Sequence, residues 1–271
     1  MKKYASTIYL CLIFGILYIP IVTVILFSLN APASTAEVSG FSFRWYRELF
    51  RSEEAWIALR NTLILAVSSA LIATVIGTAA AEGIYKMRSK LYKTAVTSVT
   101  NIPMMNPDIV TGMSMMLFFA AVMSVFKIAN YNSIGFFAML IAHTTFCLPY
   151  VILSVLPRIN ELGNSLSEAA LDLGCTPIQA FFKVKLPNIM PGVISGMVMA
   201  FTMSLDDFAV TFFTRGTIGL DTLSTYIYTD ARKGGLTPEL RPMITIMFLG
   251  ILTLLIVINL RKARAANNAA K

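Results

Sequence analysis

Charged residues are scarce in this chain. Lys, Arg, Asp and Glu make up 13% of its 271 residues, against 56% hydrophobic residues. A soluble globular domain carries about 25% charged residues, and the mean hydropathy of +0.72 is far above the range of such a domain. The composition therefore excludes a soluble or disordered chain and predicts an integral membrane protein.

Cysteine and histidine are also rare. The three cysteines, Cys11, Cys147 and Cys175, lie in or beside apolar stretches, which excludes a disulfide framework and a CxxC metal site. The single histidine, His143, is four residues from Cys147, but two ligands do not make a zinc site. We therefore expect His143 to be a core residue with satisfied hydrogen bonds, and we expect no bound metal.

The sequence lacks a nucleotide-binding loop. No glycine is followed by lysine, so the G-x-x-x-x-G-K-[ST] pattern is absent and the chain cannot hydrolyse ATP by that route. We expect no cofactor on this chain. The net charge of +8 comes without a basic helix or an aromatic-basic ribbon, so nucleic acid is not an expected partner. We interpret the basic excess as a topology signal.

Long apolar runs are what the sequence does contain. A transmembrane helix needs about 20 mainly apolar residues, and six stretches meet this requirement: 8–29, 62–81, 95–126, 134–155, 189–213 and 243–260. They are too long and too continuously apolar for the alternating strands of an outer-membrane barrel. The predicted fold class is an all-α membrane protein with six transmembrane helices, forming one domain over residues 1–271.

Basic residues indicate the orientation of the spans. If the first residues are cytoplasmic, the cytoplasmic segments hold 13 Lys and Arg and the opposite segments hold 9. The cytoplasmic set is Lys2, Lys3, Lys86, Arg88, Lys90, Lys93, Arg158, Lys183, Lys185, Arg261, Lys262, Arg264 and Lys271. The positive-inside rule therefore predicts that both termini are cytoplasmic. Glu82 is expected to pair with Lys86, four residues later, and has no assigned role.

The first span has a second interpretation. Met1-Lys2-Lys3, an apolar run and Ala31-Pro32-Ala33 imitate a signal peptide with its cleavage site. The run is longer than the usual 7 to 15 residues of such a peptide, so we expect a retained anchor. Between spans one and two, residues 43–50 followed by Trp56 and Ile57 predict an amphipathic helix at the outer interface. Its Trp45 either anchors this helix in the interface or contacts a transported solute.

Residues 164–187 form a polar segment with signals for two short helices. Ser165-Leu166-Ser167-Glu168 matches a capping box, and Gly174 stands where a left-handed helix end belongs. Thr176, Pro177 and Gln179 match the start of a second helix, which Leu186-Pro187 is expected to end. Such a protruding helix pair has the shape of a docking element for a soluble partner.

The spacing of this segment resembles the EAA loop of ABC importer permeases. The matching residues are Glu168, Ala169, Ala170, Gly174, Leu186 and Pro187, and the family's preferred Ile is replaced by Val184. The resemblance implies that residues 164–187 are a cytoplasmic coupling loop that docks into an ATPase subunit. Altering Ala170 or Gly174 is then expected to uncouple transport from ATP hydrolysis.

Nearly the whole chain resembles spermidine/putrescine permeases of the PotC type. The resemblance is carried by Trp45-Tyr46, residues 105–110 (MNPDIV), residues 143–149 (HTTFCLP) and residues 204–208 (SLDDF). It implies a type I ABC importer permease with MetI-like architecture in the bacterial inner membrane. The implied partners are an ATPase dimer that uses ATP and Mg²⁺, a second, PotB-like permease and an extracytoplasmic polyamine-binding protein.

Three carboxylates in the predicted spans require an explanation. A carboxylate at a helix centre costs about 2.5 to 3.5 kcal/mol on insertion scales, so Asp108, Asp206 and Asp207 should face a cavity or a partner. At about 1.5 Å per residue, Asp108 and Asp206 lie about 21 and 27 Å from the inner ends of their spans. With Ser204 one turn from Asp207, they predict a cation path. The alternative is that each Asp caps a helix or pairs with a base such as Arg215.

Two other classes of function remain open from the sequence. An importer permease with the same EAA loop can carry another solute, such as an aminoalkylphosphonate, thiamine or chelated iron. An ion-coupled secondary transporter would use the intramembrane carboxylates for proton or sodium coupling. An intramembrane aspartyl protease is disfavoured because the adjacent Asp206 and Asp207 point about 100° apart on a helix.

Overall fold

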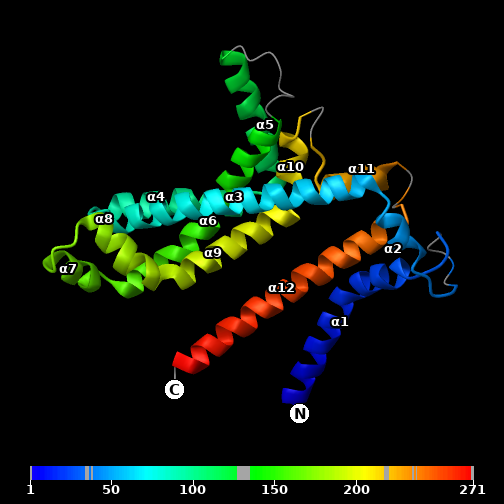
Figure 1. The fold of residues 1–271 in the computed structure, drawn as a ribbon, viewed down its shortest axis with the longest axis horizontal. Coiled ribbons are helices and arrows are strands. Elements are labelled where there is room, and N and C mark those ends of the chain that lie inside the picture. The colour runs from blue at the N-terminus through cyan, green and yellow to red at the C-terminus, as the bar shows by residue number, and fades with distance from the viewer. Residues whose placement is uncertain are drawn as a thin grey trace. The chain divides into compact units, whose positions relative to one another are not determined.

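A computed structural model describes residues 2–33, 37, 39–126, 135–216, 220–233, 235 and 237–269. Its helices are α1 (Lys2–Ser28), α2 (Arg44–Leu49), α3 (Glu53–Lys86), α4 (Lys90–Met105), α5 (Asp108–Val125), α6 (Gly135–Leu162), α7 (Ser165–Asp172), α8 (Pro177–Ala180), α9 (Leu186–Asp206), α10 (Ala209–Thr214), α11 (Leu223–Arg232) and α12 (Leu240–Ala269), with a π-helical turn, η2 (Phe181–Lys185), before α9 (Figure 1). The all-α prediction is confirmed. Lys127, Ile134 and Lys271, on which predictions also rest, lie outside the described residues.

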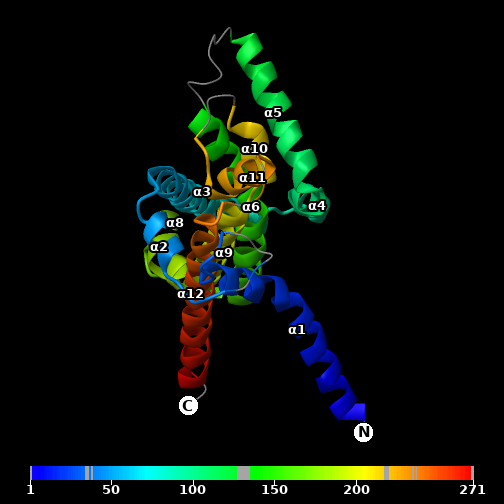
Figure 2. The ribbon, with the colours of Figure 1, turned by 90° about the vertical axis from the view of Figure 1, so that its right-hand side faces the viewer.

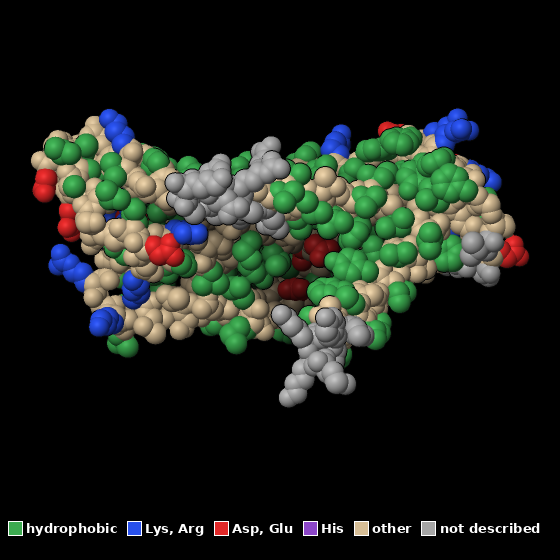
Figure 3. Space-filling model, turned by 90° about the horizontal axis from the view of Figure 1, so that it is seen from below, with side chains coloured by type: hydrophobic (Ala, Val, Ile, Leu, Met, Phe, Trp, Pro, Cys, Tyr) green, Lys and Arg blue, Asp and Glu red, His purple; other side chains and the backbone are tan. Residues whose placement is uncertain are grey.

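Six helical segments of the described chain are long and apolar enough to cross a membrane: Tyr9–Ser28, Glu53–Lys86, Asp108–Val125, Gly135–Leu162, Pro177–Asp206 and Leu240–Val257. Six spans were predicted, and each overlaps one of these. On the face drawn in Figure 3, hydrophobic side chains predominate on the surface. Water does not favour such a surface, whereas a bilayer does.

Two predicted spans are broken. The predicted span 95–126, which Pro103 and Pro107 were expected to interrupt, is interrupted at Pro107: α4 ends at Met105 and α5 begins at Asp108 at a sharp angle (Figures 1 and 2). Asn106, before Pro107, has extended backbone angles of φ −80° and ψ 142°, as a residue before proline prefers. The predicted span 189–213 is likewise divided into α9 and α10 at Asp207 and Phe208.

The region before the second span also differs from the prediction. Trp56 and Ile57 were assigned, with residues 43–50, to an amphipathic helix at the outer interface. In the structure that helix is α2 alone, and Trp56 and Ile57 lie in the first turns of α3. A turn at Phe50 and Arg51 separates the two helices. Glu53 and Glu54, in the first turn of α3, favour a helix start there because carboxylates interact favourably with a helix N-terminus.

The chain divides into two compact units, Ala58–Thr225 and the pair of segments Met1–Ile57 and Tyr226–Lys271. The prediction of a single domain stays a prediction. In the first unit, α6 packs on α9 through glycines that bring the two backbones close. A Cβ on Gly192 would lie 2.9 Å from the backbone oxygen of Ser154, and one on Gly196 would lie 3.1 Å from Cα of Val151. The fully buried Val151 and Val155 occupy the centre of this core.

In the second unit, α1 packs against α12, and α2 also contacts α12. The segment after α1 is fixed by Asn30, whose side-chain amide donates to the Glu37 carbonyl at 2.7 Å and accepts from the Ser39 amide at 3.0 Å. Trp45 is 6% exposed, and its indole N–H donates to the Asn30 carbonyl at 2.7 Å. Trp45 therefore anchors α2 to the end of α1, and its assignment to a solute path stays a prediction.

Candidate functional site

A pocket of about 320 Å³ brings the three predicted carboxylates together. It is lined by Pro103, Asp108, Thr111, Phe146, Tyr150, Thr202, Met203, Asp206, Asp207 and Val210. The helix breaks at Pro107 and at Asp207 position Asp108 at the first turn of α5 and Asp206 at the last turn of α9. The two interruptions of the predicted spans thus meet at one cavity, as is required of irregular backbone at membrane depth.

The three carboxylates have different surroundings. Within the part of the chain that the structure describes, the side chains of Asp108 and Asp206 are exposed and form no hydrogen bond or ion pair. The Asp207 side chain is only 6% exposed. It accepts from the backbone amides of Val210 at 3.3 Å and Thr211 at 2.8 Å, at the start of α10. Asp207 is therefore a helix-capping residue, whereas Asp108 and Asp206 are available to a ligand.

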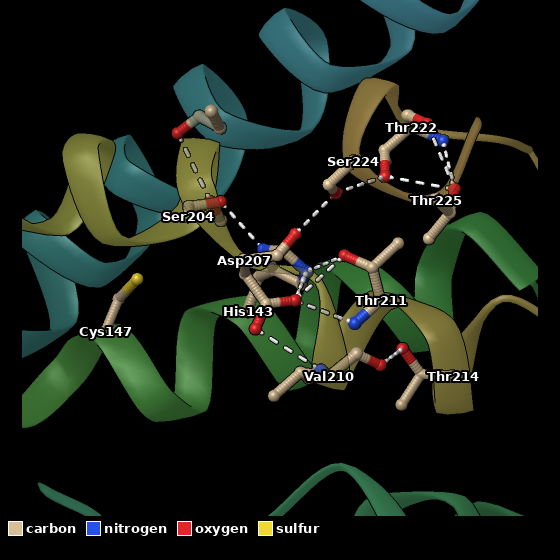
Figure 4. A network of polar contacts seen from close by, with 12 residues as sticks. His143, Cys147, Ser204, Asp207, Val210, Thr211, Thr214, Thr222, Ser224 and Thr225 are labelled. Atoms are coloured by element: carbon tan, nitrogen blue, oxygen red, sulfur yellow. Dashed lines mark hydrogen bonds and ion pairs between the residues drawn. The ribbon is translucent and has the colours of Figure 1, made fainter. Parts of the chain in front are cut away.

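A chain of polar contacts leads from Asp207 into the core (Figure 4). The Thr211 hydroxyl donates to Oδ2 of Asp207 at 3.0 Å, and Nε2 of His143 lies 2.9 Å from the Thr211 hydroxyl and 3.5 Å from Oδ2 of Asp207. Nδ1 of His143 lies 2.7 Å from the hydroxyl of Ser204, which accepts from Ser69 at 2.8 Å. The predicted core role of His143 is confirmed, because the ring is fully buried and both nitrogens have partners.

The donor and the acceptor in each contact of this polar network follow from the Thr211 hydroxyl. Each hydroxyl has one hydrogen, and that of Thr211 is donated to Asp207, so Thr211 accepts from Nε2 of His143. In a neutral imidazole Nδ1 then accepts, so Ser204 donates to it. Ser204 was predicted to line the solute path next to Asp207. It is 3% exposed, and in the structure it positions His143, which in turn faces Asp207.

Arg215, which was predicted as an alternative partner of the three aspartates, is paired with another residue. Arg215 forms an ion pair with Asp221 and lies 5.3 Å from the ring centroid of Phe212. Asp221 in turn accepts from the Thr225 hydroxyl at 3.3 Å. No ion pair between Arg215 and Asp108, Asp206 or Asp207 is present among the described residues, so the cation in this region does not neutralise the pocket.

The EAA loop begins differently from the prediction. Ser165 was expected to cap α7 in a capping box with Glu168, but α7 begins at Ser165, after Asn164, and no side chain caps it. Asn164 has helical backbone angles of φ −97° and ψ −20°, and its carbonyl accepts from the Glu168 amide at 2.9 Å. The capping-box prediction at Ser165 is wrong because the helix starts one residue earlier than the box requires.

The end of α7 follows the prediction. Gly174 has φ +84°, and its amide donates to the Leu171 carbonyl at 2.9 Å, while the Cys175 amide donates to the Ala170 carbonyl at 3.0 Å. This pair of bonds is a Schellman motif, which favours glycine at its left-handed position. Ala170 is buried, whereas Glu168 and Ala169 are exposed. The turn thus places the first EAA residues on the surface.

The second half of the loop is capped as predicted, but it does not end where predicted. The Gln179 amide donates to the Thr176 hydroxyl at 3.3 Å, and the Thr176 amide donates to the Gln179 side chain at 3.0 Å, with Pro177 in the first position. The expected end at Leu186-Pro187 is wrong, since both residues lie in the first turn of α9. Proline is tolerated there because first-turn amides have no helical partner.

The tip of the EAA loop presents apolar side chains. Leu173 is 86% exposed, Ile178 71% and Phe182 61%. Beside them, a cavity of about 560 Å³ is lined by Glu82, Tyr85, Lys86, Met87, Arg88, Asn164, Ser167, Glu168, Leu171, Pro177, Ala180, Phe181 and Lys185. This cavity lies between the end of α3 and the helices α7 and α8. At its wall, Nζ of Lys185 lies 2.7 Å from Oε2 of Glu82. The predicted pairing of Glu82 with Lys86 is confirmed at 3.1 Å.

The sequence reasoning missed two aromatic residues of the pocket. Phe146 and Tyr150 both lie on α6 and line the cavity with the carboxylates. Their spacing of four residues, which brings side chains to one helix face, was a usable signal. No group of three or more His, Cys, Asp and Glu able to hold a metal occurs in the described ranges.

Residues 53–263 match the protein family described as binding-protein-dependent transport system inner membrane component. Curated relatives include the putrescine transport system permease protein PotI of Escherichia coli K12, 34% identical over 234 residues, covering 86% of this chain and 82% of that protein. The spermidine/putrescine transport system permease protein PotC of Haemophilus influenzae is 34% identical over 249 residues, covering 92% and 93%.

Solved structures show the same fold. A chain of a bacterial ABC transporter that imports the acidic polysaccharide alginate has a TM-score of 0.70 at 15% identity, covering 97% of this chain and 95% of that one. A chain of the methionine ABC transporter MetNI has a TM-score of 0.58 at 23% identity, covering 83% and 99%.

Six helical segments able to cross a bilayer, with a carboxylate-lined pocket at two helix breaks, define the class of multi-pass membrane proteins. The chain belongs to the family of inner membrane components of binding-protein-dependent transport systems, the permeases of ABC importers. It is accordingly a transport subunit and not an enzyme.

Proposed function

We propose that this chain is the permease subunit of an ATP-driven importer and that its solute is a polyamine, spermidine or putrescine. The observation that carries the proposal is the pocket in which Asp108 and Asp206 lie beside Phe146 and Tyr150, their carboxylates unpaired among the residues that the structure describes. A polyamine alternates ammonium groups with methylene segments. Carboxylates bind the ammonium groups, and aromatic faces suit both the cations and the methylenes.

Each carboxylate has its own role in this proposal. Asp108 and Asp206 bind successive ammonium groups as the solute passes. Asp207 keeps the break between α9 and α10 in place, and Ser204 supports it through His143. Putrescine and spermidine transport permeases at 34% identity support the choice of solute.

The energy for transport enters through the EAA loop. Exposed Leu173, Ile178 and Phe182 form an apolar tip of the kind that a groove on a soluble protein can bury. We assign this tip to an ATPase dimer, which binds ATP and Mg²⁺. The loop and both chain termini are then cytoplasmic, in agreement with the placement of Lys and Arg.

Two further partners complete the proposed importer in the bacterial inner membrane. A second, PotB-like permease forms the other half of the pathway, and an extracytoplasmic binding protein delivers the polyamine. A solved alginate transporter in complex with its periplasmic protein has the same fold at 19% identity, which supports this kind of assembly.

Uptake by the reconstituted complex tests the proposal. Proteoliposomes containing the two permeases, the ATPase and the binding protein are given labelled spermidine, with unlabelled putrescine, thiamine or an aminoalkylphosphonate as competitors. ATP-dependent uptake that only polyamines inhibit is expected. Uptake that thiamine or the phosphonate suppresses equally, or the absence of polyamine uptake by an active complex, would contradict the proposal.

A further inference from the structure

A buried ion pair joins the EAA loop to α3. Lys185, the last residue of η2, has a side chain that is 4% exposed, and its Nζ lies 2.7 Å from Oε2 of Glu82. The same Nζ lies 4.4 Å from the ring centroid of Tyr85. The Tyr85 hydroxyl donates to the side-chain oxygen of Asn164 at 2.9 Å. One end of α3 thus contacts both the beginning and the end of the EAA loop.

Glu82 is shared between two lysines of different character. Its Oε1 lies 3.1 Å from Nζ of Lys86, whose side chain is 67% exposed, whereas the Glu82 side chain itself is 12% exposed. An exposed pair of this kind contributes little to stability. Lys185 is the partner that depends on Glu82, because a lysine buried to this degree needs a compensating charge.

The helix α3 is also joined to α9, which begins directly after Lys185, at a second point. The hydroxyl of Ser69 on α3 donates to that of Ser204 on α9 at 2.8 Å, and both side chains are buried. Ser69 and Glu82 are about 20 Å apart along α3, at 1.5 Å per residue. Because α9 continues directly from Lys185 and ends at Asp206, the helix that begins at the loop ends at the pocket.

We propose that the Glu82–Lys185 pair is a positioning device that locks α3 to α9 at the EAA loop, so that a displacement of the loop moves both helices as one rigid lever toward the pocket. Buried ion pairs are weak stabilisers, because desolvation offsets most of their attraction. Their better attested use is to fix a register between elements. This inference rests on the proposed coupling of the loop to an ATPase.

Single and double substitutions separate positioning from stability. Glu82→Gln leaves the buried charge of Lys185 without its partner, whereas Lys185→Met leaves Glu82 with Lys86 alone. Both are expected to lower the amount of folded complex, Glu82→Gln more strongly. Glu82→Gln with Lys185→Met removes both charges and is expected to restore that amount. Lys86→Met, which removes only the exposed partner of Glu82, is the matched control.

The deciding measurement is the number of labelled spermidine molecules imported per ATP hydrolysed by the full reconstituted complex. The proposal predicts a ratio below that of wild type for the double variant, with the ratio for Lys86→Met unchanged. A wild-type ratio in the double variant, or an equal loss in Lys86→Met, overturns the proposal. Spermidine uptake by the wild-type complex reports on the proposed solute separately, so the two ideas fail independently.

A covalent tether provides a second test that does not depend on the stability of the charge variants. In a complex with Glu82→Cys and Lys185→Cys, closing a cross-link between the two positions holds α3 and α9 together. If the helices move as one lever, the cross-linked complex regains a higher transport-to-ATP ratio than the reduced form. Loss of uptake on cross-linking, reversed by reductant, would show that the two helices must separate during transport and overturns the proposal.

Discussion

Nδ1 of His143 lies 2.7 Å from the hydroxyl of Ser204, and neither side chain reaches the surface of its unit. The imidazole joins α6 to α9 on this side and, through Thr211 and Asp207, to α10 on the other. A single ring on α6 therefore satisfies polar groups of two other helices and links all three. Its removal should affect all of them together.

His143→Ala is expected to destabilise the folded permease. Ser204 and Thr211 would lose buried partners, and each unsatisfied polar group costs about 1 to 3 kcal/mol. Thermal unfolding of the detergent-solubilised complex measures the effect. Thr145→Val, on the same helix, is the control because the Thr145 hydroxyl donates to the Ile141 carbonyl of its own helix. Equal unfolding temperatures for His143→Ala and the control would contradict the network's structural role.

Asp206→Asn is expected to reduce polyamine uptake without reducing expression. A hydrogen bond to a charged group contributes about 1.5 to 3 kcal/mol, so the ratio kcat/KM of uptake should fall about tenfold or more. Asp206→Glu keeps the charge and should retain most of the activity. Thr202→Val is the control for a change in the wall of the pocket, because the Thr202 hydroxyl already donates to the Val198 carbonyl. Unchanged uptake by Asp206→Asn would exclude Asp206 from the solute path.

Gly174→Ala is expected to lower transport more than ATP hydrolysis. A Cβ at Gly174 would meet no atom within 4 Å, so its only cost is the left-handed backbone at φ +84°, about 1 to 2 kcal/mol. Gly174→Asn should be milder, because asparagine tolerates this conformation. Uptake and ATPase rates of the reconstituted complex decide the matter, and equal effects of Ala and Asn would argue against a backbone cause.

Gly192→Ala is expected to separate α6 from α9. The new Cβ would lie 2.7 Å from Cγ of Arg158 and 2.9 Å from the Ser154 carbonyl oxygen, which cannot rotate away. Overpacking of this kind costs about 1 to 3 kcal/mol. Gly250→Ala, where a Cβ meets nothing within 4 Å, should be neutral or stabilising. A thermal unfolding midpoint of Gly192→Ala no lower than that of Gly250→Ala would contradict this packing.

Glu239 should make the stability of the complex depend on pH. Burial raises the pKa of its carboxyl, and the nearby carboxylates of Glu48, Asp230 and Glu54 raise it further. Since the folded pKa is above the unfolded one, the penalty is present at neutral pH and is relieved as pH falls through the folded pKa. Glu239→Gln should therefore unfold at a higher temperature than wild type at pH 7, with the difference vanishing in acid. A constant difference would contradict it.

The six spans could be predicted because a bilayer imposes length and composition directly on the sequence. The exact positions of the breaks within the spans were harder to predict from the sequence. Pro103 and Pro107 were both visible, yet Pro103 lies inside α4 whereas Pro107 marks its end. Which proline kinks a helix and which ends it depends on the packing of the carbonyls that lose their partners, and a single sequence does not contain that information.

The candidate site was predictable only in part. Asp108, Asp206 and Asp207 could be selected because unpaired carboxylates are costly in a membrane. Their separate roles could not be predicted, because Asp207 is a helix cap only when the amides of Val210 and Thr211 turn toward it. The contacts of His143 are with residues 61 and 68 positions away in the chain, so only the packing of α6 against α9 and α10 reveals them.

The π-helical turn η2 has a consequence for how the chain tolerates changes in length. A π turn holds one residue more than the α-helical path it replaces, and η2 lies directly between α8 and α9. Deleting one residue from Phe181–Lys185 would let the helix close as a regular α-helix, and the segments on either side would keep nearly the same rotational phase, because the extra residue is absorbed within the π turn. The rotational phase of the exposed Ile178 relative to Asp206 should therefore survive the loss of one residue from η2, whereas the loss of one residue from the regular part of α9 would rotate the tip of the loop by about 100°.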